Sequence, residues 1–134
     1  MKNEHIKTLI NYRLDRSKES LKAAKILLEN NMLTSAMNRI YYSMFYSVQA
    51  LLLLHETSFL KHGQVKGYFN REFINKDIFP KDFGRLYNKV FEYRQKFDYI
   101  DLVIPEPEMI SEYTGSAENF IEEIEKYIEK EWEK

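Results

Sequence analysis

Residues 34–56 read TSAMNRIYYSMFYSVQALLLLHE, and they form the most apolar stretch of the chain. This stretch contains neither glycine nor proline, so nothing inside it interrupts a helix. As a helix it would be roughly 30 Å long, about the width of a small domain. Apolar side chains would lie on nearly every side of it, which is typical of a buried helix. We therefore predict a central bundle helix from Thr34 to Glu56, capped at its start by Thr34 or Ser35.

This helix is not expected to cross a membrane. Its uninterrupted apolar run extends only from Ala50 to Leu54, whereas a span needs about 20 mostly apolar residues. The N-terminus also lacks the basic start and apolar stretch of a signal peptide. We expect a cytoplasmic protein without membrane contact.

Composition favours one helical domain over residues 1–134. The chain has no cysteine, four glycines and three prolines, so a disulfide framework, a thiolate metal site and a cysteine nucleophile are excluded. Charge is unevenly placed: residues 1–67 carry a net charge of +5 and residues 68–134 a net charge of −6. Two explanations remain open, namely antiparallel packing of the basic and acidic helices, or a basic face for RNA or an acidic partner.

Four further helices flank the central one in this prediction. The first runs from Glu4 to Asn30, with an apolar stripe that is interrupted at Ser17. A short helix follows over residues 64–75, another over 82–97, and a last one starts near Glu108, after prolines that forbid a continuous helix. No useful stretch alternates with the two-residue period of a strand. The sequence predicts an all-α antiparallel four-helix bundle with a short additional helix.

Motifs for metals, cofactors and phosphate loops are missing. The histidines, His5, His55 and His62, have no metal-binding spacing, and the chain has no glycine-rich phosphate loop. We expect no metal and no cofactor, and no DNA-binding motif is present. Lys61 and His62 stand at the start of the short helix, where backbone N–H groups could hold an anion. The alternative is that His62 only caps or packs there.

A second polar group gathers around two arginines. Arg39 interrupts the apolar central helix, so burial would oblige it to find a carboxylate, carbonyl groups or water. Asp98 has two possible partners: Arg94, four residues earlier on its own helix, or Arg39 across the bundle. The second pairing would place these side chains, with Tyr42, in a polar cleft between helices and create an arginine-rich phosphate site.

Three segments together resemble the HEPN domain family. They are RIYYSMFYSVQALL at residues 39–52, KHGQV with FNREF between residues 61 and 73, and RQKFDY at residues 94–99. Their order and spacing are similar to an uncharacterised bacterial and archaeal subfamily. The resemblance implies a bundle of four to five helices and a homodimer. It also implies a place beside a minimal nucleotidyltransferase in a toxin–antitoxin module.

Active members of that family are metal-independent ribonucleases that use an arginine followed four to six residues later by a histidine. No arginine here has such a histidine, because Asp98 and Tyr99 follow Arg94 instead. An aspartate is an anion at pH 7, so it is a poor general acid and repels an RNA phosphate.

Our first interpretation is therefore a dimeric HEPN-like module component that binds RNA, a nucleotide or its partner through Arg39, Arg94, Asp98 and Tyr99. The first alternative is a metal-independent endoribonuclease in which Arg94 stabilises the phosphorane and His62 or Tyr99 handles protons. The second alternative is a purely structural interaction module.

Overall fold

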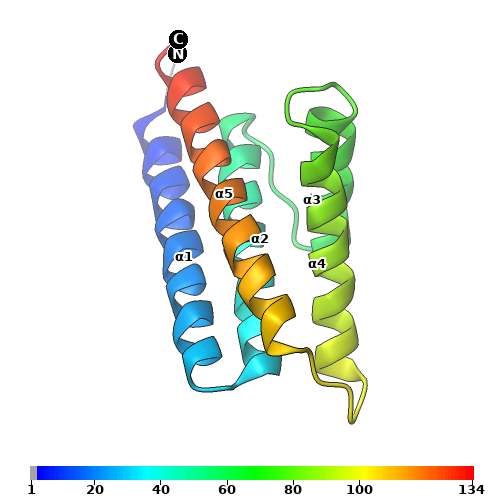
Figure 1. Ribbon diagram of the computed structural model, residues 1–134. Helices are drawn as coiled ribbons and strands as arrows, with labels where there is room; N and C mark the ends of the chain where they lie inside the picture. The colour runs from blue at the N-terminus through cyan, green and yellow to red at the C-terminus, as the bar shows by residue number, and fades with distance from the viewer. Residues whose placement is uncertain (1–2) are drawn as a thin grey trace.

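The computed structural model describes residues 3–134 as a bundle of α-helices (Figure 1). The elements are α1 (Glu4–Glu29), α2 (Leu33–Leu54), α3 (His62–Phe69), α4 (Lys81–Tyr99) and α5 (Pro107–Trp132), with a π-helical turn, η1 (Asn70–Ile74), directly after α3. No strand occurs in this part of the chain. The predicted all-α bundle with a short additional helix is confirmed.

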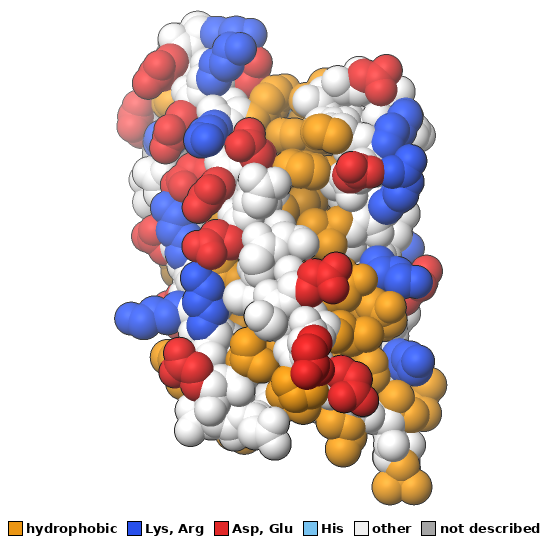
Figure 2. Space-filling view, in the orientation of Figure 1, with side chains coloured by type: hydrophobic (Ala, Val, Ile, Leu, Met, Phe, Trp, Pro, Cys, Tyr) orange, Lys and Arg blue, Asp and Glu red, His pale blue; other side chains and the backbone are white. Residues whose placement is uncertain are grey.

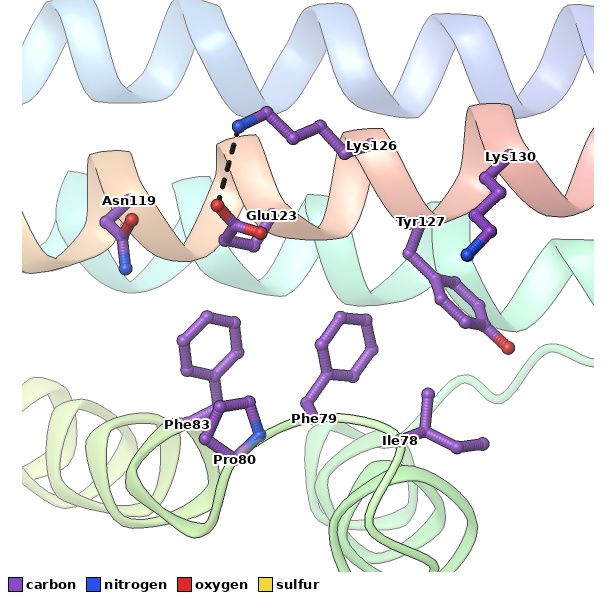
Figure 3. Close-up of a pocket in the computed structure, with 9 residues that line it drawn as sticks. All are labelled: Ile78, Phe79, Pro80, Phe83, Asn119, Glu123, Lys126, Tyr127 and Lys130. Atoms are coloured by element: carbon purple, nitrogen blue, oxygen red, sulfur yellow. Dashed lines mark ion pairs between the residues drawn. The ribbon is translucent and has the colours of Figure 1, made fainter.

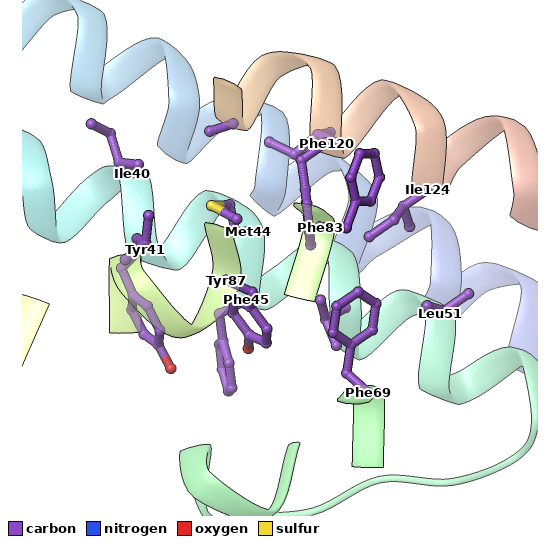
Figure 4. Packing of buried hydrophobic residues seen from close by; sticks show 14 of the residues in the cluster. Ile40, Tyr41, Met44, Phe45, Leu51, Phe69, Phe83, Tyr87, Phe120 and Ile124 are labelled. Atoms are coloured by element: carbon purple, nitrogen blue, oxygen red, sulfur yellow. The ribbon is translucent and has the colours of Figure 1, made fainter. Parts of the chain in front are cut away.

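Helix α2 is the centre of the bundle, as its apolar sequence predicts. It packs against α1, α3, α4 and α5. Its fully buried side chains include Tyr41, Met44 and Leu51. The Tyr87 ring of α4 contacts the rings of Tyr41 of α2, Phe69 of α3 and Phe120 of α5 (Figure 4). Aromatic packing therefore joins these four helices.

Helices α1 and α2 form the predicted antiparallel hairpin. Asn31, in the turn between them, has a φ of 58°, a left-handed conformation that asparagine tolerates. Ser17, the interruption in the apolar stripe of α1, is fully buried and donates a hydrogen bond to the Ser43 carbonyl at 2.6 Å. The small polar residue thus marks a close approach of two helices.

Helix α2 begins at Leu33, one residue before the predicted Thr34, and the predicted cap is wrong. The N-cap position is Met32, without a side-chain hydrogen bond, so neither Thr34 nor Ser35 caps the helix. The helix also ends at Leu54, and Glu56 adopts a φ of 52° beyond it. Packing of Leu33 and the apolar positions after it against the core extends the helix past the polar signal.

The short helix begins at His62, two residues before the predicted start, and its second half is a π-turn. This turn lies against α4 at Gly84, where an added Cβ would come within 2.9 Å of Asn70 Oδ1 and 3.0 Å of an Ile74 methyl group. Glycine leaves room there for the side chains of Asn70 and Ile74, which a Cβ would crowd.

Part of the charge asymmetry of the sequence is explained by ion pairs between the basic helix α1 and the acidic helix α5. Lys18 pairs with Glu125 at 2.6 Å, and Lys25 pairs with Glu118 at 3.1 Å. Figure 2 shows these mixed charges on one side of an apolar band that runs down the molecule beside α5. The lysines of α1 therefore support the packing explanation, whereas its two arginines, Arg13 and Arg16, contact α2.

Candidate functional site

Tyr42 is the centre of the polar group that the sequence singles out. The guanidinium of Arg39 lies 4.8 Å from its ring centroid and that of Arg94 lies 5.5 Å away. Its hydroxyl also accepts a hydrogen bond from Arg94 Nη2 at 3.2 Å. Arg39 and Tyr42 come from α2 and Arg94 from α4, so the fold brings two cations to one aromatic ring.

Asn38 closes this group into a ring of contacts. Its Oδ1 accepts hydrogen bonds from Arg39 Nε at 3.2 Å and Nη2 at 2.8 Å, while its Nδ2 donates to Asp98 Oδ2 at 2.9 Å. Asp98 in turn lies beside Arg94. Sequence reasoning missed Asn38, although its position four residues before Tyr42 on the same helix could have indicated it.

Of the two partners that the sequence left open for Asp98, Arg39 is the wrong one. Arg39 is half-buried and bonds to the neutral amide of Asn38, so it needs no buried carboxylate. Asp98 takes the other predicted partner, Arg94, with 3.3 Å between Oδ2 and Nε. That contact has ion-pair distance without hydrogen-bond geometry, since the buried Nε of Arg94 has no hydrogen-bond partner. The group carries two guanidiniums and one carboxylate.

His62 packs against the same aromatic side chains. Its ring centroid lies 4.3 Å from that of Phe45, 5.6 Å from Tyr41 and 5.7 Å from Tyr42. Burial lowers the pKa of His62, and the positive charge of Arg94 lowers it further. His62 is therefore predominantly neutral at pH 7. These ring contacts are the packing that the sequence offered as one of two roles for this histidine, and the anion-binding role stays a prediction.

Deeper in the same cluster, two tyrosine hydroxyls are buried. The rings of Tyr41 and Tyr87 stack with centroids 6.4 Å apart, and Figure 4 shows both between α2 and α4. Neither hydroxyl has a hydrogen-bond partner of good geometry. Burial raises the pKa of both hydroxyls, so both tyrosines stay protonated and neutral. The Arg94 guanidinium lies 5.3 Å from the ring centroid of Tyr41.

Comparison with known proteins identifies the family. The model of the HEPN domain matches residues 10–127. The chain belongs to the HEPN family. It is 46% identical over 121 residues to a UPF0332 protein of Thermotoga maritima, covering 90% of this chain and 92% of that relative. It is 33% identical over 128 residues to a candidate toxin of Methanocaldococcus jannaschii, covering 96% of this chain and 95% of the relative.

Two other predicted site residues, Tyr99 and Lys61, lie at the margin of the Tyr42 group. Tyr99 is 70% exposed, and the Arg94 guanidinium is 5.7 Å from its ring centroid. Lys61 is the exposed N-cap residue of α3, directly before His62. Its ammonium forms no ion pair with any residue from 3 to 134. Tyr99 thus lies beside Arg94, and Lys61 lies next to His62 in the chain.

A hollow in the surface of this HEPN domain lies away from the Tyr42 group. It has a volume of about 470 Å³ and lies between α5 and the segment around Phe79 and Phe83 (Figure 3). Lys126 and Glu123, both on α5, form an ion pair at its edge, with 3.5 Å between Nζ and Oε1. None of the sequence-predicted site residues lines it.

Residues 3–134 contain no candidate metal site and no candidate membrane helix. No group of three histidine, aspartate or glutamate side chains is arranged to hold a metal ion. None of the helices in that range is both long enough and apolar enough to cross a membrane.

Proposed function

We propose that this chain is the HEPN component of a toxin–antitoxin type module and that it acts through RNA bound at the Tyr42 group. The observation that carries the proposal is the pair of guanidiniums, Arg39 and Arg94, held on one half-buried tyrosine. Preoriented guanidiniums bind phosphate through several hydrogen bonds at once. One carboxylate against two cations leaves a net positive charge for an anion.

Relatives support the module assignment. Two of them, both from Methanocaldococcus jannaschii, are named as candidate toxins, at 33% and 31% identity. We extend to this chain a homodimeric state and a minimal nucleotidyltransferase partner, which resemblance to the family implies. Light scattering at micromolar concentration tests the dimer, and co-purification with a nucleotidyltransferase encoded next to this chain tests the partner.

RNA binding itself is tested with a single-residue change. Arg94→Gln removes one guanidinium of the site, and Arg85→Gln removes an exposed arginine on the same helix that pairs with Asp82. We expect Arg94→Gln to weaken binding of a labelled single-stranded RNA about tenfold or more, with Arg85→Gln close to wild type. Equal affinities for all three proteins would overturn the proposal.

A second candidate function is a metal-independent endoribonuclease, and one observation favours it. His62 and Arg94 lie against the same two rings, those of Tyr41 and Tyr42. A neutral imidazole can accept the proton of an attacking hydroxyl, while a guanidinium stabilises the phosphorane. Tyr99, whose ring centroid lies 5.7 Å from the Arg94 guanidinium, is the alternative group for proton transfer.

Cleavage in the presence of a chelator separates this function from binding alone. Wild-type protein that cleaves RNA in excess chelator, with loss of cleavage in both Arg94→Ala and His62→Ala, supports the enzyme. Intact RNA after incubation with wild type, together with measurable binding, leaves the binding function.

A further inference from the structure

Four of the six arginines of the chain lie in one row along α2. Arg39 belongs to α2 itself, Arg94 reaches it from α4, and Arg16 and Arg13 reach it from α1. Their contacts on α2 are Tyr42, Tyr46 and Gln49. Residues 39, 42, 46 and 49 share one face of the helix by their spacing, and all four are half-buried. This α2 arginine row is about 15 Å long.

Arg94 pairs with Asp98, but the partners of the other three arginines leave their charge available. Arg13 Nη1 donates to Gln49 Oε1 at 2.9 Å, and Arg16 Nη2 donates to the Tyr46 hydroxyl at 3.1 Å. Neutral acceptors orient a guanidinium without cancelling its charge. Among residues 3–134, Arg13, Arg16 and Arg39 form no ion pair. The two arginines outside the row, Arg71 and Arg85, both pair with carboxylates.

Aromatic surface alternates with the charges. The Arg16 guanidinium lies 5.1 Å from the Tyr46 ring centroid, and the Tyr46 ring lies 5.8 Å from that of Tyr42. Beside the row is a hollow of about 260 Å³, lined in part by Arg13, Phe45 and His62. Its rim carries Leu60, which is 99% exposed. Aromatic rings beside cations can stack on unpaired bases while the cations bind the neighbouring phosphates.

We propose that the α2 arginine row is a track for single-stranded RNA, with Arg16 and Arg13 as a second phosphate-binding subsite beyond the Tyr42 group. The inference rests on the proposed RNA-binding function and extends it. Guanidiniums contact successive phosphates, and the aromatic hollow takes a base. Paired bases of a duplex are not free to stack in such a hollow, so the track selects unpaired RNA.

The test compares two double variants with the same loss of charge. Arg13→Gln with Arg16→Gln removes the proposed subsite, and Arg71→Gln with Arg85→Gln removes the arginines outside the row. Binding of a fluorescein-labelled oligouridine, roughly 12 nucleotides long, is measured by anisotropy over a series of salt concentrations. Thermal unfolding and circular dichroism establish that each variant is folded.

We expect the first double variant to bind about tenfold or more weakly and to reduce the slope of log affinity against log salt by about one to one and a half. The second should stay within about twofold of wild type, and duplex RNA should bind more weakly than the single strand. An equal loss in both double variants overturns the track, because total charge alone would then explain binding.

Other results overturn the inference in distinguishable ways. Unchanged affinity in the Arg13/Arg16 variant, with binding lost in Arg94→Gln, overturns the track and leaves the proposed function standing. Absence of RNA binding by wild type overturns both. A change of molecular mass by light scattering with unchanged RNA affinity would make the row a protein interface and overturn the RNA track.

Discussion

Tyr42 and Arg94 are 52 residues apart in sequence, yet the Arg94 guanidinium donates to the Tyr42 hydroxyl at 3.2 Å. The contact joins α2 to α4 and fixes the guanidinium over the ring. Tyr42→Phe keeps the ring and removes the acceptor, so we expect unfolding free energy to fall by about 1 kcal/mol. RNA affinity should fall only a few fold in Tyr42→Phe and further in Tyr42→Ala, measured by denaturant titration and anisotropy.

Arg39 should contribute little to stability, because it is half-buried and bonded to a neutral amide. Arg39→Ala is expected to change the free energy of unfolding by about 1 kcal/mol or less. Breaking a buried ion pair would instead cost about 3–5 kcal/mol. Urea denaturation decides between these values, and a loss in the larger range would contradict the contacts described for Arg39.

Asp98 is the only carboxylate of the Tyr42 group, so its removal should favour an anionic ligand. Two charges about 4 Å apart interact by about 1 kcal/mol in water. Asp98→Asn should therefore bind RNA about fivefold more tightly, while the loss of the Arg94 pair costs about 1 kcal/mol of stability or less. Weaker RNA binding by a folded Asp98→Asn protein would mean that the carboxylate orients Arg94 for the ligand.

Gly84 of α4 and Gly115 of α5 should respond oppositely to alanine. A Cβ at Gly84 meets Asn70 and Ile74, whereas one at Gly115 meets nothing within 4 Å. We expect Gly84→Ala to destabilise the protein by about 1–3 kcal/mol through overpacking. Gly115→Ala should stabilise it by about 0.5–1 kcal/mol through helix propensity. Thermal unfolding of the pair measures both, and a stabilising Gly84→Ala would contradict the close contact of η1 with α4.

The pKa of His62 lies below its ordinary value of 6.5, because of burial and then the charge of Arg94. As pH falls below about 6.5, His62 is therefore protonated in the unfolded chain at a higher pH than in the folded protein. His62 contributes stability above that pH, and the contribution is lost as pH falls toward the folded-state pKa. An NMR titration of the His62 ring should show its midpoint rising in Arg94→Ala and staying fixed in Arg85→Ala.

Much of the fold could be predicted because apolar periodicity is a local property of the chain. The α1–α2 hairpin, α4 and α5 all lie within a few residues of their predicted positions. The start of α2 was not predictable in this way, since packing of Leu33 against the core overrides the capping preference of Thr34. The π-turn at Asn70 was not predicted either, and its contact with Gly84 of α4 is a tertiary one that no local pattern reveals.

The sequence predicted most residues of the Tyr42 group but not all of the contacts between them. Tyr42, Arg39, Arg94 and Asp98 do gather, because the residue spacing on α2 and α4 places them on facing sides. The pairing of Asp98 was left open between two arginines, since the choice depends on how α2 and α4 are rotated. Asn38 was missed because an amide carries no charge to mark it.

The most direct test is a two-dimensional NMR titration of isotope-labelled protein with single-stranded RNA, which reports binding residue by residue. We expect the largest shifts at Tyr42, Tyr46, Arg94 and His62, with little change on the outer face of α5. Shifts centred on Phe79 and Tyr127, in the hollow beside α5, would contradict it. So would a spectrum that RNA leaves unchanged.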